Sequence, residues 1–116
     1  MVRLKRVYEK PTKADGLRVL VDRLWPRGVS KDTAKVDVWL REVAPSDALR
    51  KWFAHDPRKW AGFRKKYHTE LKRKAGLLRT LKTLEQQHGV ITLLFAASDT
   101  ARNNAVVVTE FLKHRS

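Results

Sequence analysis

Two continuous apolar runs along the chain predict buried strands. The segment Leu17 to Arg23 has the apolar centre Val-Leu-Val at 19–21, and the segment Val90 to Ala96 is apolar almost throughout. Continuous apolar runs of this length are typical of parallel strands that helices cover on both faces. Val2, Leu4 and Val7 predict a further strand, which a short polar connection, Lys10 to Gly16, joins to the second.

The segment 36–43 supports two interpretations. Val36, Val38 and Leu40 alternate with polar or aromatic residues, which favours a third, half-buried strand. Trp39, Leu40 and Val43 would equally line one face of a short helix.

Helical patterns occupy most of the remaining chain. Ser46 predicts the N-cap of a short helix that runs through Phe53, and Asp56-Pro57 repeats this start signal after His55. Apolar residues at 60, 63, 67 and 71 lie on one helical face, and those at 77, 78, 81 and 84 continue the pattern up to the stop signal His88-Gly89. Gly76 is expected to kink or split this long helix. A last helix follows the polar loop 97–104 and buries Val107 or Val108, Phe111 and Leu112.

Strands separated by long helical connections predict an α/β protein. No linker-like or low-complexity segment divides residues 1–116. We therefore expect a single small domain with a mainly parallel sheet of about four strands flanked by helices.

Positive charge adds a possible partner to this picture. The chain holds 26 Lys and Arg residues against 12 Asp and Glu, and residues 50–82 alone contain twelve basic and two acidic ones. On the predicted helix the basic side chains project from the side opposite the apolar face. Concentrated positive charge attracts polyanions, so nucleic acid is a possible partner of the surface around residues 58–82. The four candidate contacts are Lys65, Lys66, Lys72 and Arg73. The alternative, a solvated helix face that serves solubility, is the commoner use of such charge.

The composition also excludes several kinds of chemistry. The absence of cysteine excludes a catalytic thiol, disulfides and cysteine-ligated metal. The sequence also lacks the glycine-rich motifs that bind nucleotide phosphates and the motif of a nucleophilic serine, and its four histidines do not stand at metal-ligand spacing. We expect no metal and no cofactor. The basic start lacks an apolar region after it, and the run 90–97 is too short to span a membrane, so we expect a cytoplasmic protein without membrane contact.

Polar residues at predicted strand ends form the candidate site. Asp22 to Gly28 follows the second strand, Glu42 to Ser46 follows the third, and Ser98 to Asn104 follows the last. Because ligands bind outside the carboxyl ends of parallel strands, we expect these segments to form one cleft for a phosphate or carboxylate. In it Arg27, and also Arg23, would grip the anion and Trp25 would form a flat wall. The ligand-binding candidates are Asp22, Arg23, Trp25, Arg27, Ser98, Asp99, Asn103 and Asn104.

Structural alternatives exist for these residues. Asp22 could pair with an arginine, or the arginines with backbone carbonyls, to hold the turn, while Trp25 packs into the core. Asp99 could act as a base in the cleft, but we favour a role as cap of the last helix. His55 precedes two residues with evident helix-start functions, and nothing further supports a catalytic role for it.

Several motifs together resemble one family. The segments VDRLWPRG, WLREVAPS, LRKWFAHDPRKW, FRKKYHTEL and TLLFAASDTARNNAVVVTEFL are similar to the YeaO-like branch of the DUF488 family of small bacterial proteins, over Tyr8 to Leu112. The resemblance implies a compact α/β fold and shared polar positions, but no reaction. Another branch of that family carries Cys-His-Arg at positions that match 103–105, where this chain has Asn-Asn-Ala, and the YeaO-like branch often has Asn-His at the first two. The resemblance thus favours a recognition site over a nucleophilic centre.

Overall fold

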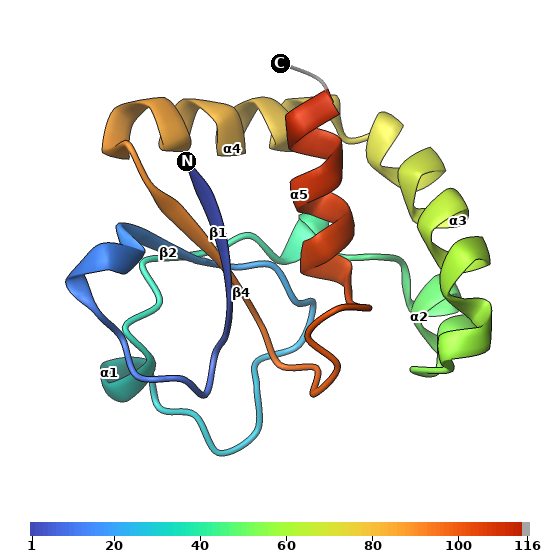
Figure 1. The fold of residues 1–116 in the computed structure, drawn as a ribbon, viewed down its shortest axis with the longest axis horizontal. Coiled ribbons are helices and arrows are strands. Elements are labelled where there is room, and N and C mark those ends of the chain that lie inside the picture. Colours follow the sequence, from blue (N-terminus) through green and yellow to red (C-terminus); the bar gives the residue numbers. More distant parts are fainter. Residues whose placement is uncertain (115–116) are drawn as a thin grey trace.

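The structure is a computed structural model that describes residues 1–114, and its centre is a four-stranded, all-parallel sheet (Figure 1). The strands are β1 (Val2–Arg6), β2 (Leu17–Leu20), β3 (Val38–Trp39) and β4 (Ile91–Phe95), in the order β1-β4-β2-β3. The expected α/β fold with a mainly parallel sheet is confirmed.

Strand β4 is the centre of the sheet and is buried along its whole length. Leu93 lies opposite Leu4 of β1 on one side and Val19 of β2 on the other. Leu93 and Val19 belong to the main core, whereas Leu94 and Leu20 belong to a smaller core on the opposite face of the sheet. The continuous apolar sequence of β4 follows from this burial on both faces.

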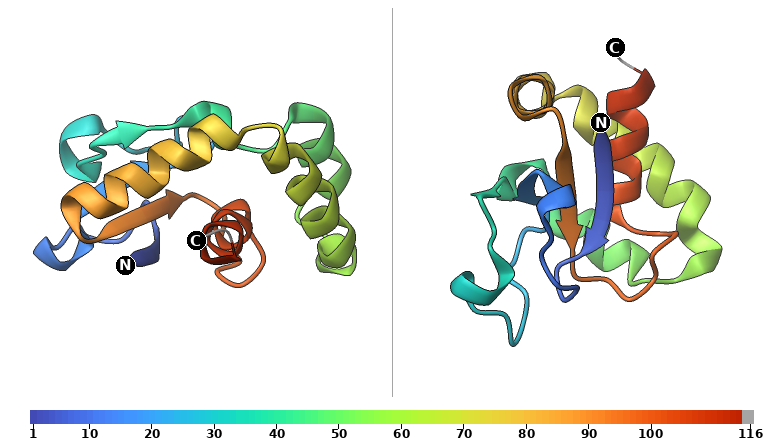
Figure 2. Two further views of the ribbon diagram at one scale, coloured as in Figure 1. Left: turned by 90° about the horizontal axis from the view of Figure 1, so that it is seen from above. Right: turned by 60° about the vertical axis from the view of Figure 1, so that its left-hand side comes forward.

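Within residues 1–114, five α-helices and three short 3-10 helices complete the fold. They are α1 (Lys31–Ala34), α2 (Asp47–Phe53), α3 (Trp60–Lys72), α4 (Ala75–His88), α5 (Asn104–His114), η1 (Lys13–Asp15), η2 (Arg41–Val43) and η3 (Pro57–Lys59). Helices α4 and α5 pack on the sheet, and α3 packs on the side of α5 that faces away from it (Figures 1 and 2). None of the helices in residues 1–114 combines the length and the apolar character needed to cross a bilayer.

Three details differ from the sequence-based expectations. The third strand has only two residues and continues into η2, so both interpretations of the segment 36–43 are partly right. The long helix breaks at Arg73 and Lys74 rather than at Gly76, because the Lys74 backbone leaves the helical conformation and its ammonium group donates to the Ala44 carbonyl at 2.9 Å. The four-residue helix α1 carries no apolar period and was not expected.

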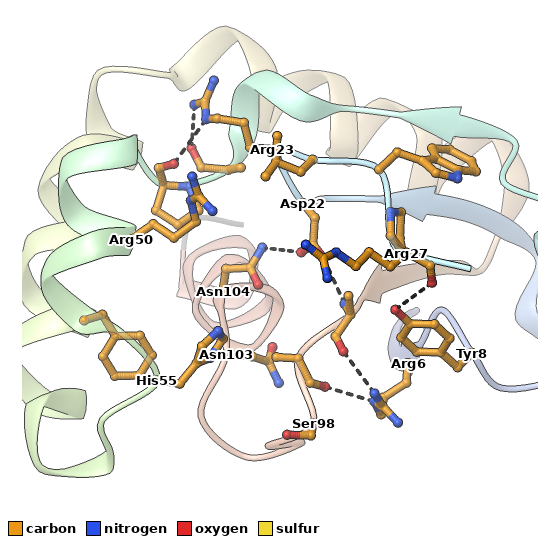
Figure 3. A pocket seen from close by; sticks show the side chains of 18 of the residues that line it. Arg6, Tyr8, Asp22, Arg23, Arg27, Arg50, His55, Ser98, Asn103 and Asn104 are labelled. Carbon is orange, nitrogen blue, oxygen red and sulfur yellow. Dashed lines mark hydrogen bonds between the residues drawn. The ribbon is translucent and has the colours of Figure 1, made fainter. Parts of the chain in front are cut away.

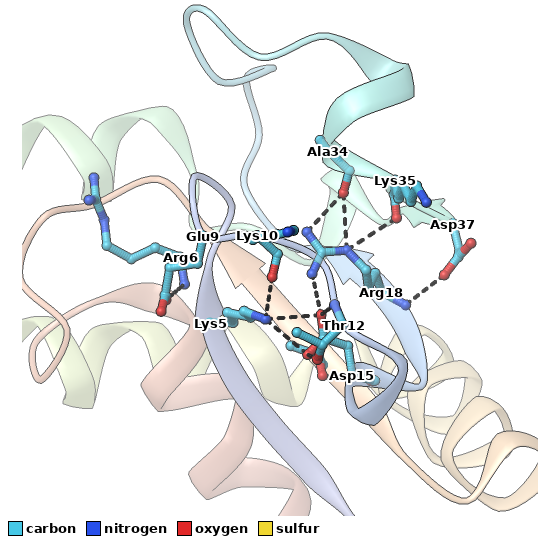
Figure 4. A network of polar contacts seen from close by, with 11 residues as sticks. Lys5, Arg6, Glu9, Lys10, Thr12, Asp15, Arg18, Ala34, Lys35 and Asp37 are labelled. Atoms are coloured by element: carbon cyan, nitrogen blue, oxygen red, sulfur yellow. Dashed lines mark hydrogen bonds and ion pairs between the residues drawn. The ribbon is translucent and has the colours of Figure 1, made fainter.

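The segment Lys10 to Gly16, expected to be a short polar connection, supplies the acidic partner of a buried ion pair with β2 (Figure 4). Asp15 and Arg18 are only 4% and 3% exposed, and Arg18 Nη1 lies 2.6 Å from Asp15 Oδ2. The other nitrogens of this guanidinium donate to the carbonyls of Ala34, at 3.0 and 2.8 Å, and Lys35. The ion pair therefore connects η1, β2 and the end of α1.

The ionisation of Asp15 makes this pair sensitive to acid. Burial raises the pKa of the Asp15 carboxyl, but hydrogen bonds from Thr12, Lys5 and Arg18 together lower it by more, from 3.8 to about 2. Since the folded-state pKa is depressed, the ionised carboxylate stabilises the fold above the unfolded-state pKa, and this stabilisation is lost as the pH falls from 3.8 toward about 2.

We expect Asp15→Asn to lower the free energy of unfolding at pH 7 by about 3 kcal/mol, because Arg18 is left as a buried charge without its partner. Urea unfolding at pH 7, and at steps between about pH 4 and pH 2, measures this effect. The difference in the free energy of unfolding between the variant and the parent protein should become smaller as the pH falls. Asp32→Asn, at an exposed carboxylate of α1, is the matched control. Equal stability of the two variants would contradict the assignment.

Candidate functional site

A pocket of about 690 Å³ opens at the carboxyl ends of β1, β2 and β4 (Figure 3). The end of β1 and the segments that follow β1, β2 and β4 supply much of its wall. The rest comes from α2 and the loops before and after it, from α3 and from the start of α5. The lining residues used below are Arg6, Tyr8, Asp22, Arg23, Leu24, Trp25, Arg27, Pro45, Arg50, Phe53, His55, Phe63, Ser98, Asn103 and Asn104.

Asp22 joins three segments at the pocket floor. Its Oδ2 accepts from the backbone N–H of Ala96, just after β4, at 2.9 Å, and its Oδ1 accepts from Nδ2 of Asn104, at the start of α5, at 3.1 Å. Asn104 Nδ2 also donates to the Val21 carbonyl at 2.9 Å. Burial raises the pKa of Asp22, and the hydrogen bonds from Ala96 and Asn104 and the proximity of His55 oppose that rise. Asp22 is thus a half-buried carboxylate held in place by the Ala96 backbone and the Asn104 side chain.

The side chains of Arg23 and Trp25 also stabilise the turn that follows β2. Arg23 donates to the carbonyls of Ala44 and Pro45, at 3.3 and 3.4 Å. The Trp25 ring packs edge to face on Trp39 with the ring centroids 5.4 Å apart, and its Nε1 donates to the Val29 carbonyl at 2.7 Å. These contacts agree with the structural alternative for both residues, although both line the pocket.

Arg27 differs from the other arginines of the pocket. Arg6 donates to the carbonyls of Ala96 and Ala97, both at 3.0 Å, and Arg50 pairs with Asp47 at 3.0 Å. The Arg27 guanidinium extends into the pocket from an exposed turn (Figure 3), and no residue in the described part of the chain accepts a hydrogen bond from it. It is therefore available for a ligand.

The loop 98–104 departs from expectation at Asp99. Its Oδ1 accepts from the backbone N–H groups of Ala101 and Arg102, at 2.9 and 3.0 Å, and it does not line the pocket. Asn103 caps α5 instead: its Oδ1 accepts from the Val106 N–H at 3.1 Å. The expectation that Asp99 caps the last helix was wrong, because the loop makes one more turn before α5 begins. The N–H of Ala101 lowers the pKa of Asp99, as do Arg102 contacts, which makes Asp99 a weak base.

Several pocket residues were not among the sequence candidates. Arg6 is the last residue of β1 and Tyr8 follows the strand, and both reach the pocket because β1 pairs with β4 in parallel. His55 lies at the pocket wall, and two consecutive positive φ angles, 47° at Ala54 and 57° at His55, direct the chain there. The end of the first strand was a signal available in the sequence, whereas the backbone of 54–55 was not.

The basic candidates lie elsewhere. Lys65, Lys66, Lys72 and Arg73 are all exposed along α3 and at its end, and none lines the pocket. Among residues 1–114, no group of three or more histidine and acidic side chains is arranged to hold a metal ion.

Comparison with known proteins identifies relatives along the whole chain. A family model described as the inactive DUF488-N3 subclade matches residues 1–116. The uncharacterized protein Rv3073c of Mycobacterium tuberculosis is 40% identical over 114 residues, which cover 98% of this chain and 95% of that protein. The uncharacterized protein YeaO of Escherichia coli is 38% identical over 112 residues, or 97% and 96% of the two chains. No solved structure matches.

We expect Asn104→Ala to lower the free energy of unfolding by about 2 kcal/mol, since it leaves the Val21 carbonyl and one Asp22 oxygen without their donor. Chemical denaturation at pH 7 measures this loss. Gln87→Ala removes an exposed amide from α4 and is the control. A loss no larger than that of the control would show that the contact of Asn104 with Asp22 does not support the fold.

Proposed function

Because the chain belongs to the DUF488 family, in the subclade described as inactive, we propose that its pocket binds a small phosphate- or carboxylate-bearing molecule and acts by recognition rather than catalysis.

The distribution of charge around the pocket carries this proposal. Four arginines line it, and Asp22 is the one carboxylate among the described lining residues. Both Asp22 oxygens already accept hydrogen bonds from the protein. The net potential of the pocket is therefore positive, and Arg27 offers the planar pair of donors that suits a phosphate or carboxylate.

The apolar part of the wall supports a ligand with more than an anionic group. Leu24, Pro45, Phe53 and Phe63 line the pocket beside the arginines. The volume of about 690 Å³ falls within the range of small-molecule sites. A ligand that joins an anionic group to a ring would use both walls.

The positions that the family resemblance links to chemistry support recognition. In this chain they hold Asn103 and Asn104, and both side chains have structural tasks: Asn103 caps α5, and Asn104 binds Asp22 and the Val21 carbonyl. The chain contains no cysteine to supply a thiolate. Neither asparagine is a nucleophile or a general base.

We expect phenyl phosphate to raise the melting temperature of the protein and to bind more tightly than inorganic phosphate, because only the former contacts the apolar wall. Arg27→Ala should weaken phenyl phosphate binding by about tenfold or more, the value expected for a charge-assisted hydrogen-bond pair, while the fold persists. Titration calorimetry and thermal unfolding measure the two effects.

Arg3→Ala provides the control for this experiment, because Arg3 is an exposed arginine of β1 outside the pocket. An equal effect of the two substitutions would rule out a specific role for Arg27. No response of the parent protein to phosphate, phenyl phosphate or benzoate would overturn the proposal itself.

A second substitution should act in the opposite direction. We expect Asp22→Asn to tighten phenyl phosphate binding at pH 7 by about fivefold, because it removes from the wall a negative charge that repels the anion. Its amide oxygen can still accept from the Ala96 N–H, and Asn104, which loses its Asp22 acceptor, keeps the Val21 carbonyl. Calorimetry on the folded variant measures this change. Weaker binding by Asp22→Asn would instead mean that the carboxylate itself contacts the ligand, contrary to the proposal.

A further inference from the structure

The surface of α2 and α3 presents an exposed tryptophan between lysines. The Trp52 side chain is 38% exposed, and Nζ of Lys59 and Nζ of Lys66 lie 5.2 and 5.1 Å from its ring centroid. The ring rests on α3 at Gly62, where an added Cβ would come within 2.8 Å of Trp52 Cη2. Gly62 thus leaves room for the indole to lie close to the helix.

Basic residues repeat along this side of the molecule. Pairs of basic residues stand at 58–59, 65–66 and 72–73, which is every seventh position. The first pair lies in η3, directly before α3, and the other two lie on α3 and at its C-cap. Seven residues are about two α-helical turns, so the pairs at 65–66 and 72–73 lie about 10 Å apart along the helix. The result is two parallel rows of positive charge that run from Trp52 along α3.

The acidic residues near this surface do not neutralise most of its positive charge. Both carboxylate oxygens of Glu70 accept from Ser46, the backbone N–H at 2.8 Å and Oγ at 2.7 Å, and so hold the start of α2. Asp56 pairs with Arg58 at 3.2 Å. Within residues 1–114, Lys65, Lys66, Lys72 and Arg73 form no ion pair.

We propose that this surface, which consists of Trp52, Lys59, Lys65, Lys66, Lys72 and Arg73, binds single-stranded nucleic acid. A base stacks on the Trp52 ring, and the phosphates that follow it lie against the basic rows of α3. Indole rings among lysines are the usual means of holding single strands without sequence preference. Lys59 Nζ also donates to the Trp52 carbonyl at 2.9 Å, so Lys66 is the lysine that a base can displace from the ring. The exchange replaces an exposed cation–π contact by a stronger stacking contact, and the released Lys66 can bind a phosphate.

The same observations favour nucleic acid over an acidic peptide. An acidic peptide would gain from the lysines but has no flat aromatic group for Trp52. The regular pairs of charges also suit a polyanion with evenly spaced phosphates. The site is separate from the pocket, because none of its residues lines the pocket.

Fluorescence anisotropy with a labelled single-stranded RNA of about 12 nucleotides tests the proposal. We expect the binding constant to fall steeply between about 50 and 300 mM salt, as it does when several phosphates are neutralised. Trp52→Leu should weaken binding about tenfold through the lost stack, whereas Trp52→Phe, which keeps an aromatic face, should stay within about threefold of the parent protein.

Two charge-reversal variants provide a second test of the RNA-binding surface. One variant replaces Lys65, Lys66, Lys72 and Arg73 by Glu, and its matched control replaces Arg3, Lys10, Lys13 and Lys31 by Glu. Both lose the same net charge, so any difference between them reports the location of the contact. We expect the first to abolish RNA binding at about 150 mM salt and the second to retain most of it.

Four results would overturn the proposal: no binding of the RNA by the parent protein, equal losses in the two charge-reversal variants, identical affinities of Trp52→Leu and Trp52→Phe, or competition by polyglutamate as strong as that by polyuridylate. The last would assign the surface to acidic peptides instead. Circular dichroism checks the fold of each variant, and the Trp52 pair decides the question if the charge reversal unfolds the helix.

Discussion

The carboxylate of Asp22 is the contact on which the site depends. It lies at the end of β2 and accepts hydrogen bonds from the first residue after β4 and from the first residue of α5. Three segments distant in sequence are thereby held at one edge of the sheet. Burial disfavours the charged form of Asp22, as the raised pKa indicates, so the protein keeps this carboxylate at some cost in stability. The pocket takes its shape from that arrangement.

Positive charge is used in two different ways on this chain. Around the pocket, the guanidinium groups of Arg6 and Arg23 donate to backbone carbonyls and thereby hold the wall together. The guanidinium of Arg27 remains available to a ligand. Along α3, the lysines project into solvent, and the one carboxylate of that helix, Glu70, is engaged by Ser46. A formal net charge of +14 alone could not have separated these two uses, because the sum does not specify which cations have partners.

The apolar pattern predicted the buried strands and the longer helices. Burial on both faces of β4 requires a continuous apolar run, and burial on one face of α3 requires apolar residues at helical spacing. The strand ends predicted which loops converge. The partner of Asp15 could not be predicted, since an acidic residue in a polar segment carries no sign of the guanidinium and carbonyls that surround it. His55 and Arg6 were missed at the site because their positions depend on local φ angles and on the order of the strands.

The order β1-β4-β2-β3 has a consequence for how the protein is made. In the part of the chain that the structure describes, β1 pairs with β4 alone, so Leu4 meets its sheet partner Leu93 only after almost the whole chain has been synthesised. Strands β2 and β3 can pair earlier, but without β4 they form an isolated two-stranded piece with exposed apolar faces. Contacts so distant in sequence slow folding. On the ribosome, the N-terminal part of this protein therefore stays incomplete and open to aggregation until its last strand emerges.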